Sequence, residues 1–246
     1  MASRVMITGA SSGIGWALAR EMAARGHHLA LTARRIDKLE ALRAQIKQDH
    51  HRLPVAVRSL DVTRYDQVGP VMADLVEVLG GLETVVVNAG ISLGEKIGRG
   101  RFDNCRRMIE TNLLGAMATV DAAFPYLQTR GRGHIVGISS VLAFRGLPRS
   151  AAYSTTKAAL ADYLLAIRPY ARRRGIDVTI LYPGFIDTPL NDMLPRRPFV
   201  ISAETGARLM ADKMVRRVKS ATIPAWPWSI AKWVLRMAPD RFIAGM

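Results

Sequence analysis

Short runs rich in β-branched residues alternate with longer segments of helical periodicity, and this alternation limits the folds open to the chain. The predicted strand–helix pairs are Arg4–Thr8 with Ile14–Arg25, His28–Thr32 with Asp37–Gln48, Val55–Ser59 with Tyr65–Leu79, and Glu83–Asn88 with Phe102–Gln128. The pattern continues with strands at His134–Ser139 and Asp177–Tyr182, a helix over about Ser150–Arg174, and a seventh strand if the segment near Thr222 adds one. Such alternation builds βαβ units and a parallel sheet covered on both faces. Because crossovers are right-handed, we predict an α/β fold with a doubly wound Rossmann-type sheet of six to seven strands.

The 246 residues fit one domain of this kind, and we expect a single domain over 1–246. The regular alternation ends after Tyr182. Prolines interrupt the next stretch at positions 183, 189, 195 and 198, and a basic helix is predicted over Ala203–Lys219. We interpret residues 185–246 as a substrate-covering flap followed by a basic, aromatic C-terminal segment, and not as a second domain.

A glycine-rich turn follows the first predicted strand directly. The segment is Thr8-Gly9-Ala10-Ser11-Ser12-Gly13-Ile14-Gly15, after which a helix begins. Glycines let the backbone turn tightly and approach a pyrophosphate, which the exposed N–H groups and the positive end of the helix attract. Immediately after strand one of a βαβ unit, such a turn predicts phosphate binding.

The end of the second strand indicates which dinucleotide binds. Where an NAD-binding fold usually places an acid for the ribose 2′-OH, this chain has Arg34 and Arg35. A guanidinium can grip a 2′-phosphate through charge-assisted bidentate hydrogen bonds. We therefore predict NADP(H) rather than NAD(H), with more weight on Arg34 because it is nearer the strand end. The alternative is that both arginines only form the solvated start of a helix.

A candidate catalytic group lies near the predicted fifth and sixth strands. Tyr153 and Lys157 are four residues apart in a helical stretch and so share one face. An ammonium group beside a phenol lowers a pKa that is normally about 10, which makes tyrosine a usable acid or base. Tyr-x-x-x-Lys alone mostly marks an ordinary helix surface. Here Ser139-Ser140 ends strand five, and a hydroxyl there can stabilise negative charge on a substrate oxygen.

Together these features resemble the short-chain dehydrogenase/reductase family over about Val5 to Thr188. Thr8–Gly15 is similar to the family's TGxxxGxG turn, and Asn112, Ser140, Tyr153 and Lys157 match its catalytic tetrad. The family's adenine-contacting pair, its NAG turn and its nicotinamide-side PG motif correspond to Asp61-Val62, Asn88-Ala89-Gly90 and Pro183-Gly184 with Ile186 and Thr188. The resemblance implies that these residues, with Arg34, Arg35, Tyr153 and Lys157, bind the cofactor.

The resemblance also implies a role for each member of the tetrad. Tyr153 would exchange a proton with the substrate oxygen, while Lys157 would hold the nicotinamide ribose and lower the tyrosine pKa. Ser140 would polarise the carbonyl, and Asn112 would fix a water for proton relay. Ser139 is then only structural, because the family spacing selects Ser140. The expected activity is reversible interconversion of a carbonyl and an alcohol by an enzyme dependent on NADP(H).

The sequence does not specify the substrate. Apolar residues in the flap and before the catalytic helix favour a greasy carbonyl compound, although they could equally be core: Phe144, Leu147, Phe185, Leu190, Met193 and Leu194. No metal is expected, since the five histidines show no ligand spacing with acids or with the lone Cys105. That single cysteine excludes an internal disulfide framework and fits a reducing compartment.

A net charge of +15 is also found in proteins that bind nucleic acids or lipid surfaces. It could attract nucleic acid or anionic lipid, but no nucleic-acid-binding motif occurs and we expect no nucleic-acid partner. Over residues 224–241, Trp226, Trp228 and Trp233 lie near basic residues, which is typical of a segment at a membrane surface. The alternative is that these tryptophans close the substrate pocket or a subunit contact.

Location, assembly and a non-catalytic alternative complete the expectations. No apolar run reaches the roughly 18 residues of a spanning helix, so we expect a cytoplasmic protein, peripheral at most to a membrane. The C-terminal stretch differs from the family's usual tetramer contact, which leaves a homodimer through 102–128 and 150–174 as the expectation. A dinucleotide sensor without turnover is the alternative to an enzyme, although the intact tetrad argues against it.

Overall fold

The computed structural model describes residues 2–94, 98–148, 150–190, 197–239 and 241. Its strands are β1 (Arg4–Thr8), β2 (His28–Ala33), β3 (Val55–Ser59), β4 (Thr84–Val87), β5 (Gly133–Ile138), β6 (Ile176–Pro183) and β7 (Ser220–Ile223). They form one parallel sheet in the order β3-β2-β1-β4-β5-β6-β7. The doubly wound sheet is confirmed, and the segment near Thr222 does add a seventh strand.

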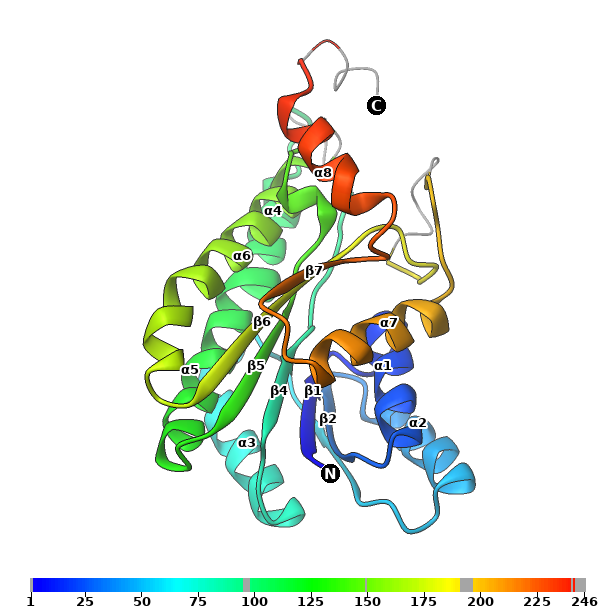
Figure 1. Cartoon of the computed structure of the whole chain (residues 1–246), viewed down its shortest axis with the longest axis vertical. Helices are drawn as coiled ribbons and strands as arrows, with labels where there is room; N and C mark the ends of the chain where they lie inside the picture. The colour runs from blue at the N-terminus through cyan, green and yellow to red at the C-terminus, as the bar shows by residue number, and fades with distance from the viewer. Residues whose placement is uncertain (1, 95–97, 149, 191–196, 240, 242–246) are drawn as a thin grey trace.

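Eight α-helices are found in the part of the chain that the structure describes. They are α1 (Gly13–Ala24), α2 (Ile36–Asp49), α3 (Tyr65–Leu79), α4 (Phe102–Ile109), α5 (Gly115–Thr129), α6 (Ala151–Arg172), α7 (Ala203–Val215) and α8 (Trp228–Met237). Figure 1 shows α1, α2 and α7 on one side of the sheet and α3, α5 and α6 on the other. The chain therefore has the three-layer arrangement expected of βαβ units.

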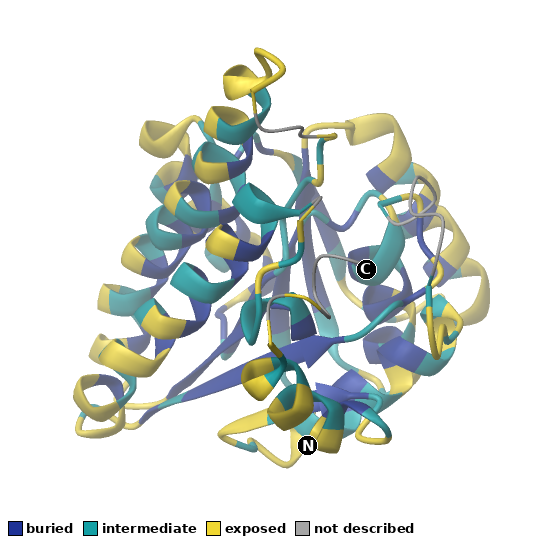
Figure 2. Cartoon of the chain, turned by 90° about the horizontal axis from the view of Figure 1, so that it is seen from above, coloured by how far each residue is buried: buried dark blue, intermediate teal, exposed yellow. Residues whose placement is uncertain are grey.

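Each face of the sheet has its own apolar core. One core contains Val68 and Met72 of α3, Val120 of α5 and Leu160 of α6. The other contains residues of α1, α2 and α7. Seen from above in Figure 2, the strands and the inner sides of the helices are buried while the outer sides are exposed. The alternation of apolar and polar residues in each helix sets this division, because only one stripe can face the sheet.

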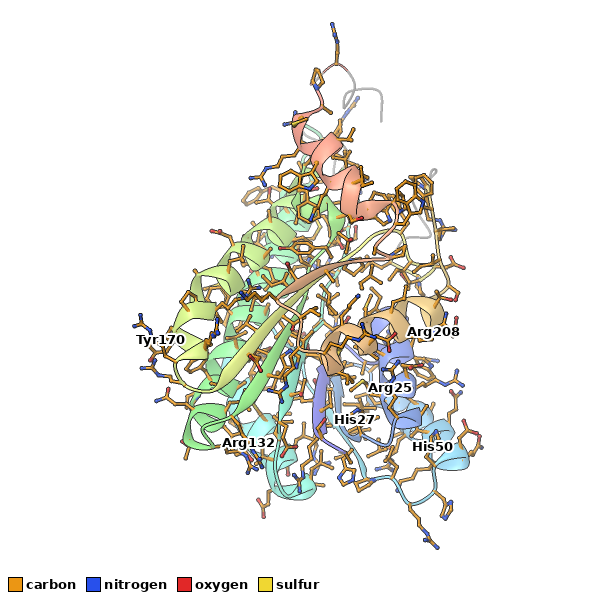
Figure 3. The ribbon with its side chains drawn as sticks, viewed as in Figure 1. Arg25, His27, His50, Arg132, Tyr170 and Arg208 are labelled. Atoms are coloured by element: carbon orange, nitrogen blue, oxygen red, sulfur yellow. The ribbon has the colours of Figure 1, made fainter. Side chains whose placement is uncertain are left out.

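Helix α7 crosses back to pack on α1, although about 180 residues separate them in the chain. Arg25, just after α1, forms an ion pair with Asp212 at 2.8 Å and donates to the carbonyl oxygen of Arg208 at 3.3 Å. Figure 3 shows Arg25 and Arg208 near each other on this side of the molecule. The contact completes the core on the α1 face.

Two helix predictions need correction. The helix expected over Phe102–Gln128 is interrupted by a π-helical segment at Glu110–Leu114 between α4 and α5. The helix expected over Ala203–Lys219 ends at Val215, since Arg217 adopts a left-handed backbone conformation with φ of 49° and turns the chain into β7. Within the described residues, no helix combines the length and apolar character that crossing a bilayer requires.

Candidate active site

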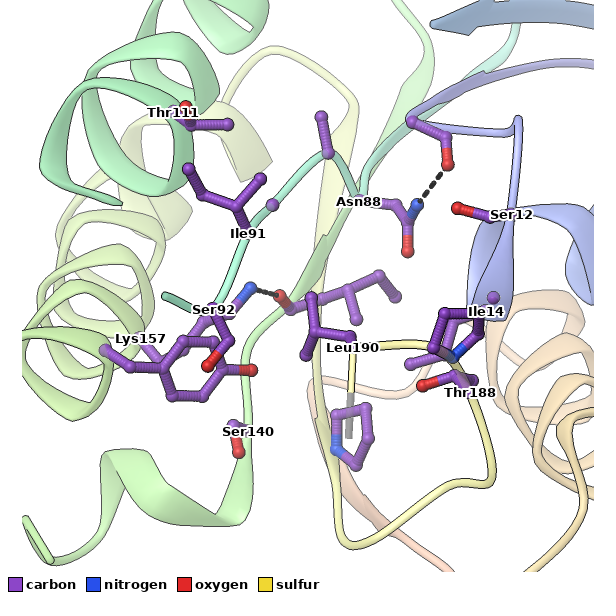
Figure 4. A pocket seen from close by; sticks show the side chains of 18 of the residues that line it. Ser12, Ile14, Asn88, Ile91, Ser92, Thr111, Ser140, Lys157, Thr188 and Leu190 are labelled. Carbon is purple, nitrogen blue, oxygen red and sulfur yellow. Dashed lines mark hydrogen bonds between the residues drawn. The ribbon is translucent and has the colours of Figure 1, made fainter. Parts of the chain in front are cut away.

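A cavity of about 380 Å³ opens at the carboxyl ends of the strands, where β1 and β4 lead their chains to opposite faces of the sheet. This is the position at which doubly wound sheets bind ligands. Figure 4 shows Ser140 and Lys157 on one side of the cavity and Ser12 and Asn88 across from them. The sequence-predicted residues that line it are Gly9, Ser11, Ser12, Gly13, Ile14, Arg34, Arg35, Asp61, Val62, Asn88, Ala89, Gly90, Ser140, Tyr153, Lys157, Pro183, Gly184 and Thr188.

The glycine-rich turn is packed too tightly for side chains at two positions. Gly9 has φ of 70°, and a Cβ atom there would lie 2.7 Å from the Cα atom of Ala89. A Cβ atom on Gly15 would lie 2.5 Å from the carbonyl oxygen of Gly9. Gly15 thus does not line the cavity; it lets α1 begin close beneath the turn. The resulting open backbone at Ser11 to Gly13 is a cradle of the kind that receives phosphate groups.

Thr8 and Asn88 hold the ends of β1 and β4 together. The Thr8 hydroxyl group accepts hydrogen bonds from the backbone N–H groups of Asn88, at 3.0 Å, and Ala89, at 3.1 Å. The Asn88 side chain in turn donates to the carbonyl oxygen of Thr8 at 2.8 Å. Thr8 is fully buried and does not line the cavity. Its function is to fix the position of the turn relative to the neighbouring strand.

The two arginines after β2 make different contacts, and the prediction that favoured Arg34 is changed in favour of Arg35. Arg35, and not Arg34, reaches the glycine-rich turn: its Nη2 atom donates to Ser11 Oγ at 3.0 Å and to Ser12 Oγ at 2.9 Å. Arg34 lines the same cavity, while its carbonyl oxygen accepts from Ser59 Oγ. Arg35 precedes the first residue of α2 and has an extended backbone, which turns its side chain toward the cavity.

On the same side, Asp61 and Val62 follow β3. One Asp61 carboxylate oxygen accepts from both the N–H group and the hydroxyl group of Thr63, at 3.0 and 2.8 Å, which forms a local turn. Val62 packs against Gly115 of α5, where a Cβ atom would lie 2.7 Å from Val62 Cγ2. Both residues line the cavity, as the sequence predicts.

Ser140, Tyr153 and Lys157 come together at the other side of the cavity. The Ser140 and Tyr153 side chains share a hydrogen bond, and Ser140 Oγ also accepts from the N–H group of Leu142 at 3.1 Å. Lys157 Nζ lies 5.8 Å from the centre of the Tyr153 ring and donates to the carbonyl oxygen of Ile138 at 2.9 Å. Ser139, expected to be only structural, donates to the carbonyl oxygen of Lys157 at 2.8 Å.

Burial dominates the protonation of this group. It raises the pKa of Tyr153 to about 12, and the hydrogen bond with Ser140 opposes that rise. Burial also lowers the pKa of Lys157 from 10.5 to about 8. The sequence predicts that the ammonium group lowers the tyrosine pKa, but here the loss of solvation outweighs any such effect, because a phenolate is costly in a low-dielectric site. At neutral pH, Tyr153 is protonated and Lys157 is mostly charged.

Asn112 is fully buried in the π-helical segment and does not line the cavity. Its carboxamide group accepts from the N–H group of Ile91 at 2.8 Å, donates to the Ile91 carbonyl oxygen at 2.9 Å, and donates to Thr156 Oγ1 at 3.2 Å. The side chain thus links the loop after β4 to helix α6. Both N–H groups of its amide donate within the protein, and its expected role in fixing a water stays a prediction.

The turn after β6 forms the remaining wall. Pro183, Gly184 and Thr188 line the cavity, whereas the predicted cofactor residue Ile186 is fully buried in the core against Gly206. A Cβ atom on Gly184 would overlap the indole ring of Trp228 in α8. The backbone returns beside this turn, where Ile201 donates to the Phe185 carbonyl oxygen at 3.1 Å. The turn after β6 therefore packs directly against Trp228.

Some of the apolar residues predicted to contact substrate lie elsewhere. Phe185 and Leu190 line the cavity, but Phe144 stacks on Tyr182, with ring centres 4.6 Å apart, and Leu147 does not line it. Met193 and Leu194 lie outside the described residues. The loop at Ile91 and Ser92 lines the cavity as expected, but sequence reasoning missed Leu142 and Ser150, whose only signal is that they follow a strand end or precede α6.

In the described part of the chain, no group of three or more histidine, cysteine, aspartate or glutamate side chains could hold a metal ion. Trp228 is also placed differently from its two neighbouring tryptophans. It is only 5% exposed and contacts the Phe185 and Phe199 rings, whereas Trp226 and Trp233 are exposed. Trp228 thus packs behind the cavity wall formed by Gly184 and Phe185, while the exposed Trp226 and Trp233 remain open to either interpretation.

Known proteins resemble this chain in both sequence and fold. The family model for short chain dehydrogenases matches residues 3–197. An uncharacterised oxidoreductase of Mycobacterium tuberculosis is 36% identical over 97% of this chain and 94% of its own length. An uncharacterised oxidoreductase of Myxococcus xanthus is 35% identical over 96% of this chain and 92% of its own.

Two solved structures add to this likeness. An alcohol dehydrogenase from the archaeon Thermococcus sibiricus, complexed with 5-hydroxy-NADP, has a TM-score of 0.81 and 27% identity, covering 90% of this chain and 96% of its own. ElxO with NADP bound has a TM-score of 0.77 and 26% identity, covering 87% and 92%. With the turn, the Ser140–Tyr153 pair and the sheet order already described, these matches show that the chain belongs to the short-chain dehydrogenase family and is an oxidoreductase.

Proposed function

We propose that this protein is an NADP(H)-dependent oxidoreductase that interconverts a carbonyl group and an alcohol on an apolar substrate, with Tyr153 as the acid or base. One observation carries the proposal: a single cavity joins a glycine-rich turn suited to phosphate with a hydrogen-bonded Ser140–Tyr153 pair next to Lys157. The turn would hold the phosphates of a nicotinamide dinucleotide. The Ser140–Tyr153 pair would lie where the nicotinamide end meets the substrate.

The residues present fit such a cofactor. The crowding around Gly9 and Gly15 leaves backbone N–H groups at the start of α1 open to a pyrophosphate, and Arg35 adds a guanidinium group beside Ser11 and Ser12. An arginine at this position favours a 2′-phosphate. Two relatives of known structure were solved with NADP or 5-hydroxy-NADP, which agrees with this choice. When bound, the dinucleotide supplies or accepts the hydride.

The protein's own groups handle the proton. Because burial raises the pKa of Tyr153 to about 12, the phenol is protonated at neutral pH and can donate to a carbonyl oxygen as that oxygen gains charge. Ser140, already hydrogen-bonded to Tyr153, offers a second donor at the same oxygen. The protonated phenol is the form that reduction needs at neutral pH, and oxidation, which needs the phenolate, becomes faster with rising pH.

The substrate side of the cavity is mainly apolar. Ile91, Leu142, Phe185 and Leu190 line the cavity, together with the hydroxyl groups of Ser92 and Ser150. Such walls favour a carbonyl compound with a sizeable hydrocarbon part, since burying apolar surface there is favourable. Substrate identity beyond this class is not proposed.

The first test is a fluorescence titration of NADPH and NADH against the wild type, Arg35→Ala and Arg34→Ala. We expect NADPH to bind more tightly than NADH, and Arg35→Ala to weaken NADPH by about tenfold or more while changing NADH little. Arg34→Ala is the matched comparison, with a smaller effect. Equal affinity for the two dinucleotides in the wild type would refute the role of Arg35 in selecting NADP(H).

The second test separates an enzyme from a sensor. Wild type and Tyr153→Phe are assayed with NADPH against a panel of apolar aldehydes and ketones. We expect turnover by the wild type and a loss of about 100-fold or more in the variant, whose NADPH affinity stays close to normal. A protein that binds NADPH but turns over nothing in the panel, with Tyr153→Phe changing no property, would favour the non-catalytic alternative.

We also propose a homodimer through the helices at 102–128 and 150–174. Phe102, Leu114 and Leu165 of these helices are exposed by 78%, 40% and 45%, which supports an apolar contact there. Sedimentation equilibrium of the wild type and of Leu114→Lys tests it, because a charge in a dimer contact would dissociate the subunits. A wild-type monomer would refute the proposal. The cytoplasmic location remains a prediction from the sequence.

A further inference from the structure

Helix α8 has two apolar faces, and the described residues of the chain cover only one of them. Its inner face packs Trp228, Ala231 and Leu235 onto the core beneath α6 and β6. The residues of its outer face recur at the spacing of a helical stripe and are exposed by 56%, 58%, 61% and 79%: Ile230, Trp233, Val234 and Met237. Helices at the surface of a folded protein normally carry polar residues there. The outer stripe thus calls for a second apolar environment.

Trp226 extends this stripe in front of the helix. It is 71% exposed and lies two residues before α8. Together with the four outer-face residues it makes up what we call the outer stripe, which contains two tryptophans and no acid. In Figure 1, α8 lies beyond the carboxyl ends of β5 and β6, at the same end of the molecule as the candidate active site.

The charge around the outer stripe selects its partner. Residues 213–239 contain six lysines and arginines and no aspartate or glutamate. Two of the six, Lys232 and Arg236, lie within α8 itself, and Lys232 Nζ lies 5.5 Å from the Trp233 ring centre. A second copy packed on this face about a twofold axis would bring equal positive charges together. An anionic surface would instead meet complementary charge.

We propose that the outer stripe docks the protein on a bilayer that contains anionic lipid, with α8 lying in the plane of the interface. Tryptophan and aliphatic side chains enter the boundary between headgroups and acyl chains, and Lys232 and Arg236 contact the lipid phosphates. The helix does not cross the bilayer. The proposal does not depend on the reaction, because binding to lipid is measured without turnover.

The test is flotation of the full-length protein with phosphatidylcholine vesicles, with and without phosphatidylglycerol. We expect strong binding only to the vesicles with phosphatidylglycerol. Trp233→Ser with Val234→Ser removes the apolar contact and lowers the vesicle partition coefficient by about tenfold or more. Lys232→Gln with Arg236→Gln lowers it by about thirtyfold. Substitution suits the test better than truncation, which would remove Trp228 from the core.

Matched controls lie on other surfaces. Val78→Ser removes an apolar side chain that is 55% exposed on α3, and Arg52→Gln removes an exposed cation between α2 and β3. Both controls should bind vesicles like the wild type. The proposal is overturned if the wild type does not float with anionic vesicles, or if the α8 variants float as it does. It is equally overturned if the protein does not bind lipid and sedimentation shows a dimer that Trp233→Ser dissociates.

Discussion

The buried imidazole of His134 makes folding stability depend on pH. His134 lies in β5, is 2% exposed, and its Nε2 atom is 2.8 Å from Thr179 Oγ1. The Thr179 hydroxyl group donates to the carbonyl oxygen of Val218 at 2.6 Å, so the imidazole must donate to it and is neutral with Nε2 protonated. Burial, together with the nearby Arg217, lowers the pKa of His134 from 6.5 to about 4.

The sign and size of the effect follow from these two pKa values. Since the folded protein disfavours the charged form, His134 leaves stability intact above pH 6.5 and reduces it as the pH falls toward 4. A tenfold change in a protonation equilibrium is worth about 1.4 kcal/mol, so the full loss is about 3 kcal/mol, of which about 2 kcal/mol is present at pH 5. This is a large share of the stability of a single domain.

Urea unfolding at pH 7 and pH 5 measures the effect in the wild type and in His134→Gln, whose amide can still donate to Thr179. The wild type should lose about 2 kcal/mol more than the variant between the two pH values. Burial also lowers the pKa of His27, but that group titrates in both proteins and cancels in the comparison. His51→Gln, at an exposed histidine, should behave like the wild type. Equal losses in wild type and His134→Gln would refute the reasoning.

Three further predictions concern the cavity. Gly15→Ala should lower the unfolding free energy by about 2 kcal/mol and weaken NADPH binding, because its Cβ atom would lie 2.5 Å from the Gly9 carbonyl oxygen; unchanged values in denaturation and titration would contradict the crowding. Gly184→Ala and Trp228→Leu should each destabilise by about 2 kcal/mol, yet the double variant should be about 1–2 kcal/mol better than their sum, as a double-mutant cycle would measure; additive costs would exclude the contact. Lys157→Met should abolish turnover but raise stability at pH 7 by up to about 3 kcal/mol, a gain that fades as the pH rises from about 8 to 10.5, since burial disfavours the ammonium form; lower stability of the variant by urea unfolding would contradict this.

The elements of the sheet could be predicted because each one carries its own pattern. Strands such as Val55–Ser59 agree with the structure residue for residue, since a short β-branched run directly after a proline is typical of a strand. The interruption at Glu110–Leu114 could not be predicted, because a π-helical turn has no residue preference that distinguishes it from the helix around it.

The site residues were predictable as a set, but their individual orientations were not. Arg34 and Arg35 both line the cavity, but it is Arg35 that donates to Ser11 and Ser12 of the turn, and this contact depends on the backbone conformation before α2. The same holds for the tryptophans, where the start of α8 determines that Trp228 is buried and Trp233 exposed. Thr156 as the partner of Asn112 was missed, because the contact joins residues 44 positions apart.

The return of α7 onto α1 has a consequence for how the chain is made. The apolar face of α1 is complete only when Met210 and Met214 cover it, and the ion pair between Arg25 and Asp212 can form only then. At about 5–20 residues per second, some 10 to 40 s pass on the ribosome before α7 is synthesised. During that time the first βαβ unit exposes apolar surface that the finished protein hides. A nascent chain stalled before residue 203 is therefore expected to bind chaperones, whereas one released after α7 can close both cores.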